Sequence, residues 1–439
     1  SDVILTQKLF RKLLVEGFPK HELPILSDMM KCYTEPSIVI DTPIVRASLD
    51  EARQKRESLL LQIHPDPERA IKMIRSDDIF AEMLKLHGID PPTKVNKNNE
   101  TKWAFAKTDV DFVALEEDDN EDVQILVATR LDSKSTQRES RSQRFLDIAS
   151  RGLMPYPMAY YAAHTGRPGG WDKINPLNFK RSTKEKKEPL RMAMKALPGY
   201  VFVVGDSSQI EARLLPWLAC QEDILEDFRN GVDTYCVFAS KVFDRPITKA
   251  DEVERFVGKT SILGLGFGTG DVKLQNTLKK GQGKIKVDLP LEQCTGIVNL
   301  YRGENHMVVR FWGDCQTALE RMVAGEQYSF GRNDLLKVVG KSIELPSGFR
   351  LNYWNLRKQP KLDKNGQQEF TPSNRPKMEF VYDKKNERTG RTETVKVYGA
   401  KVAENITQAL AGSIVRHQWG LIRKQFKIVG HVYDELIAL

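Results

Sequence analysis

The spacing of hydrophobic and polar positions predicts that the first third of the chain is mostly helical. Helical patterns extend over residues 1–153, with an extended stretch at 36–41. A helix over 42–61 begins with Thr-Pro, and proline is favoured in the first helical turn. The acidic run at 116–122 is interpreted as a solvated loop and not as a metal cluster, because neighbouring carboxylates repel one another.

The pattern changes at Tyr200. The β-branched and aromatic run Tyr200–Val204 predicts a buried strand that delivers the carboxylate of Asp206 at its end. The rest of the pattern predicts, in order, a helix-rich segment at 210–324, turn-rich and strand-prone sequence at 328–399, a helix at 400–425 and a strand at 427–439.

Composition adds size and charge to this picture. A chain of 439 residues is long enough for about two to four lobes. Hydrophobic residues make up 40% and charged residues 29%, as in globular proteins. Lysine and arginine outnumber aspartate and glutamate by 67 to 59, and the net charge of +8 suggests a polyanionic partner, a weak indication by itself.

Two classes of protein are excluded. No stretch approaches the roughly 18 uncharged apolar residues of a membrane helix, and the first residues do not form a signal peptide, so we expect no membrane association. The cysteines are odd in number, dispersed and without a Cys-x-x-Cys motif, which is typical of reduced thiols in an intracellular protein. They are Cys32, Cys220, Cys236, Cys294 and Cys315.

Acidic residues stand in two hydrophobic segments, at Asp206 and at Asp434–Glu435. An unpaired buried carboxylate is costly, so a fold retains one beside a cation or a metal. Adjacent in a sheet, such aspartates could hold two Mg²⁺ ions about 3.5–4 Å apart, an arrangement suited to in-line displacement at phosphorus. The alternative is a helix-capping Asp206 and an exposed Asp-Glu turn, and spacing alone leaves both open.

A helix that starts near Asp251 carries Arg255, Lys259, Leu263 and Phe267 at intervals of four, so these side chains share one face. Cations followed by apolar side chains would suit a nucleoside triphosphate lying along the helix. An ordinary amphipathic helix frayed by glycines explains the pattern equally well. The glycines are Gly264, Gly266, Gly268 and Gly270.

A further group of basic and polar residues suits phosphates and minor-groove edges, although a solvated helix face explains the arginines equally well. The group comprises Arg130, Lys134, Ser135, Thr136, Arg138, Arg141, Arg144, Thr165–Arg167, Asn175, Asn178, Lys180 and Arg181.

Taken in order, these motifs resemble the polymerase region of family A DNA polymerases, the group that contains bacterial DNA polymerase I and many phage replicases. Val203–Arg213 resembles the first palm motif, Arg255–Gly268 the nucleotide-binding fingers helix, and Val432–Glu435 the second palm motif. Supporting matches are Lys134–Thr136, Thr165–Arg167, Asn175–Asn178 and Glu404–Gln408, so the resemblance covers nearly the whole chain.

The resemblance implies a catalytic centre with two Mg²⁺ ions, for which Mn²⁺ can substitute. Asp206 and Asp434 would bind the metal together with the carbonyl oxygen of Ser207, and Glu435 would support them. Lys259 would also protonate the leaving pyrophosphate.

The resemblance also implies binding residues. For the nucleotide they are Arg255 and Lys259 at the triphosphate, Glu211 as a steric gate against a ribose 2′-hydroxyl, Phe267 near the templating base, and Leu263 and Tyr235 against the nucleotide. For primer–template DNA they are Lys134, Ser135, Thr136, Arg167, Asn175, Asn178, Gln408 and Tyr433.

Several positions depart from the family pattern. Leu263 replaces an aromatic residue, Phe267 a tyrosine, and Tyr433 a histidine. His431 and Glu404 stand where glutamine and asparagine are usual. These departures favour a phage-type replicase in the cytoplasm of an infected bacterial host, with primer–template DNA, deoxynucleoside triphosphates and other replication proteins as partners.

The implied fold is α+β, a right-hand polymerase fold with an antiparallel palm sheet, helical fingers and a helical thumb. We expect an exonuclease remnant and linker at 1–44, the thumb at 45–155, the palm at 156–215 and 331–439, and the fingers at 216–330. Asp2 resembles the last carboxylate of a proofreading exonuclease, although a helix cap describes this residue equally well. Both chain ends look cut, and we expect no proofreading from this chain. The competing hypotheses are a single-subunit RNA polymerase-like enzyme and a catalytically silent DNA-binding relative.

Overall fold

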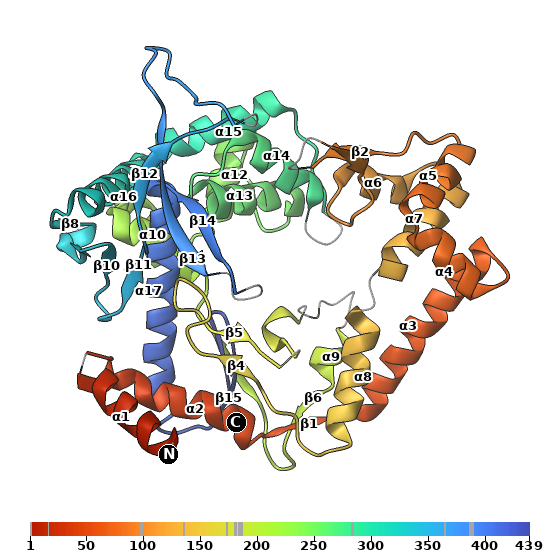
Figure 1. The fold of residues 1–439 in the computed structure, drawn as a ribbon, viewed down its shortest axis with the longest axis horizontal. Helices are drawn as coiled ribbons and strands as arrows, with labels where there is room; N and C mark the ends of the chain where they lie inside the picture. The colour runs from red at the N-terminus through yellow and green to blue at the C-terminus, as the bar shows by residue number, and fades with distance from the viewer. Residues whose placement is uncertain are drawn as a thin grey trace. The chain divides into compact units, whose positions relative to one another are not determined.

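The structure is a computed structural model. It describes residues 2–15, 17–96, 100–134, 137–172, 174–179, 182, 188–281, 285–363, 366–385 and 390–439. The chain forms two compact units, and each is built from helices and small antiparallel sheets, an α+β composition (Figure 1). Unit 1 comprises Ser1–Lys31, Met158–Trp171 and Val203–Ala438; unit 2 comprises Cys32–Pro157, Asp172–Phe202 and Leu439.

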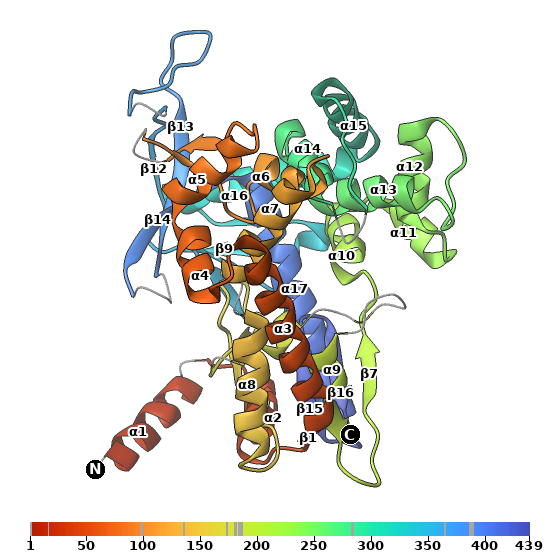
Figure 2. The same ribbon diagram turned by 90° about the vertical axis from the view of Figure 1, so that its right-hand side faces the viewer.

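Unit 2 is mainly helical, as the hydrophobic pattern predicts. Its long helix α3 (Thr42–Ile63) begins where expected, because the Asp41 side chain accepts a hydrogen bond from the amide of Ile44 and a proline occupies the first turn. Helix α8 (Gln137–Ala149) lies beside α3 (Figure 2). The other helices are α4 (Pro67–Arg75), α5 (Asp77–Leu86), α6 (Val110–Ala114), α7 (Glu121–Lys134) and α9 (Pro189–Met192).

Unit 2 also contains two short two-stranded sheets. The expected extended stretch is β1 (Ile38–Ile40), which pairs with β6 (Met194–Ala196). The hairpin of β2 (Thr93–Val95) and β3 (Thr101–Trp103) interrupts the helical run and is absent from the sequence prediction. The core of this unit clusters around Ile74, Phe80, Leu84, Phe105, Phe112, Val123, Leu126 and Val127.

Arg130 corrects one expectation about the basic group. It is fully buried beneath this core, with its guanidinium over the rings of Phe80 and Phe105. The guanidinium donates hydrogen bonds to the carbonyl oxygens of Ile74 and Ser76 and forms an ion pair with Asp77. Arg130 therefore joins helices α4, α5 and α7 and is inaccessible to a phosphate.

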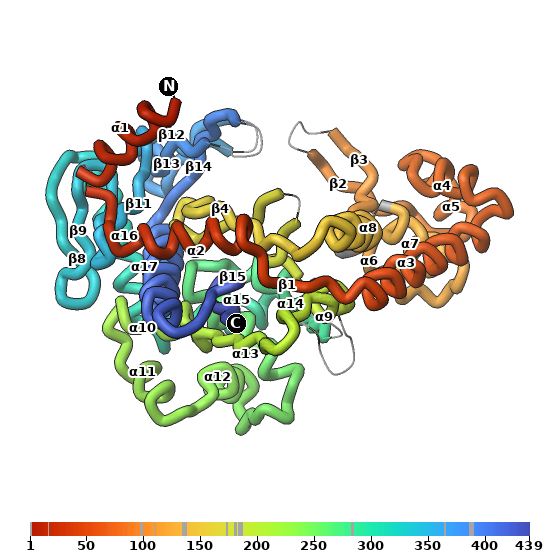
Figure 3. The backbone as a smooth tube through the Cα atoms, turned by 90° about the horizontal axis from the view of Figure 1, so that it is seen from below, coloured from red at the N-terminus to blue at the C-terminus, as the bar shows by residue number. Residues whose placement is uncertain are grey.

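Unit 1 contains the helix-rich segment, which begins and ends as predicted. Its core lies between α12 (Thr234–Phe243), α13 (Glu252–Leu265), α14 (Asp271–Lys280) and α15 (Leu291–Glu304). Helix α10 (Ile210–Ala219) lies beside the long α17 (Gly399–Ile422) (Figure 3). The remaining helices are α1 (Asp2–Val15), α2 (Leu23–Thr34, which ends in unit 2), α11 (Glu222–Arg229) and α16 (His306–Ala324).

The strand-prone segment forms several small sheets. Strands β8 (Tyr328–Phe330), β9 (Leu336–Val339), β10 (Ser342–Glu344) and β11 (Arg350–Asn352) make one. Strands β12 (Arg357–Pro360), β13 (Met378–Lys385) and β14 (Thr392–Val397) make a second, and β4 (Met158–Ala159) pairs with β5 (Gly169–Gly170).

The sheet that holds the acidic segments has the order β15 (Ile428–Val432), β16 (Glu435–Ala438), β7 (Val203–Asp206). Two expectations about it are wrong. The segment after Lys427 is a hairpin of two strands and not one strand. Strand β7 is exposed, with Val203 and Val204 57% and 50% accessible, because the described part of the chain covers neither side chain fully.

All five cysteines are free thiols, as expected. None of the helices in the described part of the chain is both long and apolar enough to cross a membrane.

Candidate active site

The two acidic segments meet in the β15–β16–β7 sheet. Asp206, the last residue of β7, stands opposite Glu435, the first residue of β16. The amide of Ser207 donates a hydrogen bond of 2.9 Å to the carbonyl oxygen of Asp434. The hydroxyl of Ser207 donates to the side-chain oxygen of Gln418 on α17, at 2.8 Å. Sheet pairing therefore brings Asp206 and Asp434 to neighbouring positions.

The surroundings of the three carboxylates differ. Asp206 is exposed and Asp434 half-buried, whereas Glu435 is buried. Asp434 lies in the turn between β15 and β16, and the preceding Tyr433 has a φ of 56°, the left-handed conformation that closes this turn. Asp434 thus lies in a turn, as the alternative interpretation has it, but neither Asp434 nor Glu435 is fully exposed, and backbone pairing brings this turn to the end of β7.

The donor set at this edge is the kind that a hard divalent cation prefers. Carboxylate oxygens come from Asp206 and Asp434, and backbone oxygen is available at Ser207, whose carbonyl also accepts the amide of Ile210 at 3.2 Å. Within the described residues, no three His, Cys, Asp or Glu side chains already converge in metal-binding geometry. The residues fit a metal bound partly by substrate and water, as is usual for Mg²⁺.

Helix α13 presents Arg255 next to α12. The Arg255 guanidinium donates to one carboxylate oxygen of Asp233 through Nε at 2.9 Å and Nη2 at 2.7 Å, and it lies 5.5 Å from the ring centre of Tyr235. The other oxygen of Asp233 caps α12 by accepting the amides of Tyr235 and Cys236, at 3.1 and 3.3 Å. Asp233 thus joins the first turn of α12 to Arg255.

The close approach of α12 and α13 depends on Gly258. A Cβ at this position would stand 2.2 Å from the carbonyl oxygen of Tyr235, so no larger residue fits.

Burial raises the pKa of Asp233, but the hydrogen bonds from Arg255 and from the Cys236 amide outweigh burial and hold that pKa below its ordinary value. Burial raises the pKa of Tyr235, so its phenol stays neutral. The Arg255–Asp233 pair is therefore charged at neutral pH.

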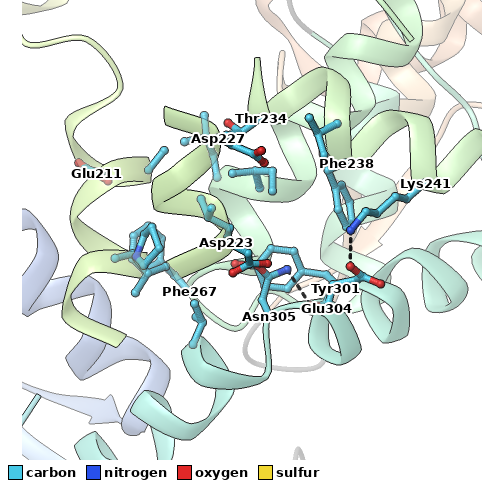
Figure 4. A pocket seen from close by; sticks show the side chains of 18 residues that line it. Glu211, Asp223, Asp227, Thr234, Phe238, Lys241, Phe267, Tyr301, Glu304 and Asn305 are labelled. Carbon is cyan, nitrogen blue, oxygen red and sulfur yellow. Dashed lines mark hydrogen bonds and ion pairs between the residues drawn. The ribbon is translucent and has the colours of Figure 1, made fainter. Parts of the chain in front are cut away.

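The prediction that Arg255, Lys259, Leu263 and Phe267 share one face of a single helix is wrong for Phe267. Helix α13 ends at Leu265, and Phe267 lies in the following turn. This turn reaches Gly268, whose φ of 75° requires glycine and whose Cβ would stand 2.6 Å from that of Ala400. Leu263 and Phe267 nevertheless line the same hollow, together with Glu211 in the first turn of α10 (Figure 4).

This hollow has a volume of about 60 Å³, opens to solvent and carries several acidic residues. Its acidic residues are Glu211, Asp223, Asp227 and Glu304, and Glu304 forms an ion pair with Lys241 (Figure 4). Burial, and then the charge of Asp223, raise the pKa of Asp227. The apolar lining comes from helices α10, α11, α12, α13, α15 and α16, so the hollow lies among the helices that follow Asp206.

Glu211 also forms an ion pair with Arg167, which follows the β4 segment. The loop of Arg167 is fixed by Arg416 of α17, which donates a 3.1 Å hydrogen bond to the carbonyl oxygen of Gly166. Arg416 in turn pairs with Glu22 at 2.9 Å, and both side chains are buried. A buried network therefore supports the residues that line the hollow.

Residues 160–337 match the family model described as DNA polymerase family A. The chain is related to the family A DNA polymerases. It is 31% identical over 259 residues to the DNA polymerase of Bacillus phage SP02, a match that covers 56% of this chain and 37% of that protein. It is 36% identical over 106 residues to DNA polymerase I of Chloroflexus aurantiacus, which covers 24% of this chain and 11% of that protein. The chain thus matches well under half the length of each.

The fold is similar to a solved polymerase domain. The structure titled "POL domain of Pol1 from M. smegmatis complex with DNA primer-template and dNTP" has a TM-score of 0.63 and 18% sequence identity, covering 99% of this chain and 66% of that one. Family A DNA polymerases use divalent metal ions in general, which agrees with the oxygen donors at Asp206 and Asp434.

The residues expected at DNA divide between the units. In unit 1, Arg167 forms an ion pair with Glu211, and the side chain of Tyr433 is partly exposed. On α17, Nε2 of Gln408 donates a hydrogen bond of 3.4 Å to Oε1 of Glu404. In unit 2, Asn175 precedes a short 3₁₀ turn and Asn178 is its last residue, and Lys134 ends α7. Ser135 and Thr136 lie outside the described residues.

The sequence analysis did not predict three residues that contact the candidate site or its supporting network: Asp233, Arg416 and Glu22. Asp233 carries a recognisable signal, since an aspartate just before a helical pattern is a capping position. Arg416 lies on the buried face of α17, three residues before the buried Trp419, which is unusual for arginine. Nothing local marks Glu22, because its partners Arg416 and Tyr160 are distant in sequence.

Proposed function

We propose that this chain is the polymerase part of a template-directed DNA polymerase of phage type, which adds deoxynucleotides to a primer 3′-hydroxyl and releases pyrophosphate. The observation that carries the proposal is the pairing of Asp206 with the Asp434–Glu435 segment. From Asp206 the chain leads directly into α10, whose Glu211 faces the hollow beside Leu263 and Phe267 of the cationic helix segment.

At the metal site, Asp206 and Asp434 would bind two Mg²⁺ ions, with the carbonyl oxygen of Ser207 as a further ligand and Mn²⁺ able to substitute. When bound, the ions would lower the pKa of the primer hydroxyl and neutralise charge on the pyrophosphate. Glu435, buried one residue further along, would orient this edge of the sheet.

For the triphosphate, Arg255 would exchange the carboxylate of Asp233 for phosphate oxygens, since both accept hydrogen bonds from a guanidinium fork. Lys259 follows one turn further along α13 and would bind the same phosphates. Its ammonium would donate a proton to the departing pyrophosphate oxygen. Tyr235, under Arg255, would complete the binding surface.

For the sugar, Glu211 would occupy the space of a ribose 2′-hydroxyl, so that ribonucleotides are excluded sterically. The ion pair with Arg167 supports this role, because it holds the Glu211 side chain in one orientation. Leu263 and Phe267 would pack against the nucleotide and the templating base.

For DNA, we propose contacts from Arg167, Gln408 and Tyr433 in unit 1 and from Lys134–Thr136 and Asn175–Asn178 in unit 2. Residues 45–155 would serve as the thumb, 216–330 as the fingers, and 156–215 with 331–439 as the palm, after a remnant at 1–44. The similarity to a Bacillus phage polymerase supports a replicase acting in the host cytoplasm with other replication proteins.

The test is extension of a labelled DNA primer on a DNA template, with Mg²⁺, Mn²⁺ or EDTA and with deoxynucleotides or ribonucleotides. The proposal predicts metal-dependent extension with deoxynucleotides only. Extension with ribonucleotides alone would instead indicate an RNA polymerase, and DNA binding without extension would indicate a silent relative.

A further inference from the structure

The β12–β13–β14 sheet of unit 1 carries a feature that the proposed function does not use. Its connection between β12 and β13 is itself held together by bridges, Leu362 with Gln368 and Phe370 with Pro376. This connection extends beyond the end of the sheet (Figure 1). We call residues 357–397 the ribbon.

The ribbon concentrates the positive charge of the chain. Residues 357–397 contain eleven lysines and arginines and six acidic residues, an excess of five, against eight for all 439 residues. A strongly charged face of one sign favours a partner of the opposite sign.

Most described acids of the ribbon are neutralised within it. Glu369 pairs with Lys361 at 2.7 Å and with Lys377 at 3.2 Å. Glu379 pairs with Lys396 at 3.0 Å, and Asp383 pairs with Arg357 at 3.0 Å. Across the part of the ribbon that the structure describes, four exposed cations have no acidic partner within ion-pair distance: Lys358, Arg375, Lys384 and Lys385.

An exposed tryptophan stands at the same end as two of these lysines. The side chain of Trp354 is 69% accessible, and its carbonyl oxygen accepts the amide of Asp383 at 2.8 Å, so Trp354 lies beside the strand position next to Lys384. Asn355 also bonds the Asp383 carboxylate, at 2.8 Å, which fixes the Trp354 segment to β13. Aromatic rings beside a cationic track are the means by which proteins bind single-stranded nucleic acid.

This surface adjoins the Thr165–Arg167 segment, which contains a residue that we propose above to contact DNA. His164 packs against Tyr353 and Tyr382, with ring centres 5.3 and 5.4 Å away, and it immediately precedes Thr165–Arg167. Burial lowers the pKa of His164 to about 4, and the positive charges of Lys384 and Lys401 contribute to this shift. Tyr382 stands two residues before Lys384 on β13, so the end of this strand lies near the loop that contains Arg167.

We propose that the ribbon and the adjoining Trp354 bind single-stranded DNA, with an unpaired base stacked on Trp354 and phosphates at Lys384 and Lys385, the lysines at the end of β13. Stacking requires an unpaired base, so a template overhang is the strand that fits and fully paired DNA is not. The identification of the strand as template rests on the proposed function; the binding itself rests on the ribbon.

The test is equilibrium binding of a fluorescent oligothymidine to the full chain, in a salt series, beside a blunt duplex of equal length. Trp354→Ala should weaken single-strand binding by on the order of tenfold, whereas Trp354→Phe, which keeps a ring, should retain most of the affinity. Lys384→Gln with Lys385→Gln should lower the slope of log affinity against log salt by about 1.4, that is, roughly 0.7 for each phosphate that a lysine no longer neutralises. Lys337→Gln, an exposed lysine of β9, is the matched control and should leave both affinity and slope unchanged.

An unchanged oligothymidine affinity in Trp354→Ala would overturn the proposal, and so would an equal loss of affinity for the blunt duplex or an equal loss in Trp354→Phe. Circular dichroism and the melting temperature of each variant separate loss of binding from loss of folding. Primer extension by the unaltered chain is measured in parallel. Trp354-dependent binding without extension would refute the proposed function and leave the ribbon site standing.

Discussion

The amide of Ser207 donates a hydrogen bond to the carbonyl oxygen of Asp434, 2.9 Å away. This main-chain hydrogen bond joins the end of β7 to the turn before β16, so that residues Asp206 and Asp434 lie at the same end of the sheet. Backbone pairing resists side-chain substitution, so either carboxylate can be replaced while the two segments stay joined. The chemistry of the site can therefore be tested separately from its folding.

Asp233 is expected to stabilise unit 1 both as a helix cap and as the partner of Arg255. Asp233→Ala removes the cap of α12 and leaves Arg255 without this carboxylate, so it should lower the free energy of unfolding by about 1–3 kcal/mol. Asp233→Asn keeps the capping oxygen and should lose less. Urea unfolding measures both variants, and equal stability of Asp233→Ala and the unaltered chain would contradict the capping role.

The buried Arg416–Glu22 pair should show strong coupling. Removing one partner, as in Arg416→Met, leaves a buried carboxylate uncompensated and should cost about 3–5 kcal/mol of unfolding free energy. Arg416→Met with Glu22→Gln should recover much of this loss, because neither charge then remains. A double-mutant cycle by urea unfolding measures the coupling, and additive losses would show that the two side chains act independently.

Glu211 should determine the choice of sugar. Glu211→Ala opens the space next to Leu263 and should raise ribonucleotide incorporation by on the order of tenfold or more, with a smaller effect on deoxynucleotides. Single-nucleotide incorporation with matched deoxy- and ribonucleotides gives the ratio. Glu320→Gln, an exposed acid of α16, serves as the control, and an unchanged ratio in Glu211→Ala would mean that the gate lies elsewhere.

His164 should make the stability of the fold depend on pH below neutrality. Its pKa in the folded chain is lowered to about 4, first by burial and then by Lys384 and Lys401, and its Nε2 is buried with no hydrogen-bond partner in the described structure. Because the unfolded chain binds a proton from about pH 6.5 downward and the folded chain does not, stability is complete above about 6.5 and falls as the pH drops toward 4.

Replacing His164 isolates this contribution from that of other groups. In His164→Gln the decline of unfolding free energy between pH 6.5 and 4 should be smaller by on the order of 2–3 kcal/mol. Urea unfolding at several pH values gives the comparison. If unfolding free energy declines with pH equally in the variant and the unaltered chain, His164 has the same pKa in the folded and unfolded states.

Local signals made much of the fold predictable. Thr42–Pro43 with Asp41 before it specified the start of α3, and the boundaries at Ile210 and Ala324 follow from helical periodicity. The failures concern relations between distant segments. The exposure of Val203 depends on which distant segments cover the faces of β7, a property that the sequence of the strand does not contain.

The candidate site was also predictable only where the signal is local. The acidic and cationic residues of the site stood out as residue types in unusual positions, as at Asp206 within apolar sequence. Long-range contacts were not predictable, because the burial of Arg130 depends on carbonyl groups more than fifty residues away, and Glu22 contacts Arg416 across most of the chain. Phe267 does not share the helical face of Leu263, because α13 ends at Leu265, just before Gly266 and Gly268. Periodicity alone does not predict where this helix ends.

The most direct test of the account is primer extension by Asp206→Asn and Asp434→Asn, measured beside the binding of primer–template DNA by the same proteins. If the paired aspartates hold the catalytic metal, each substitution should reduce extension by on the order of a thousandfold or more while DNA affinity stays within a few-fold, since the Ser207–Asp434 hydrogen bond is retained. Extension within about tenfold of the unaltered chain in either variant would contradict a catalytic centre at this edge of the sheet.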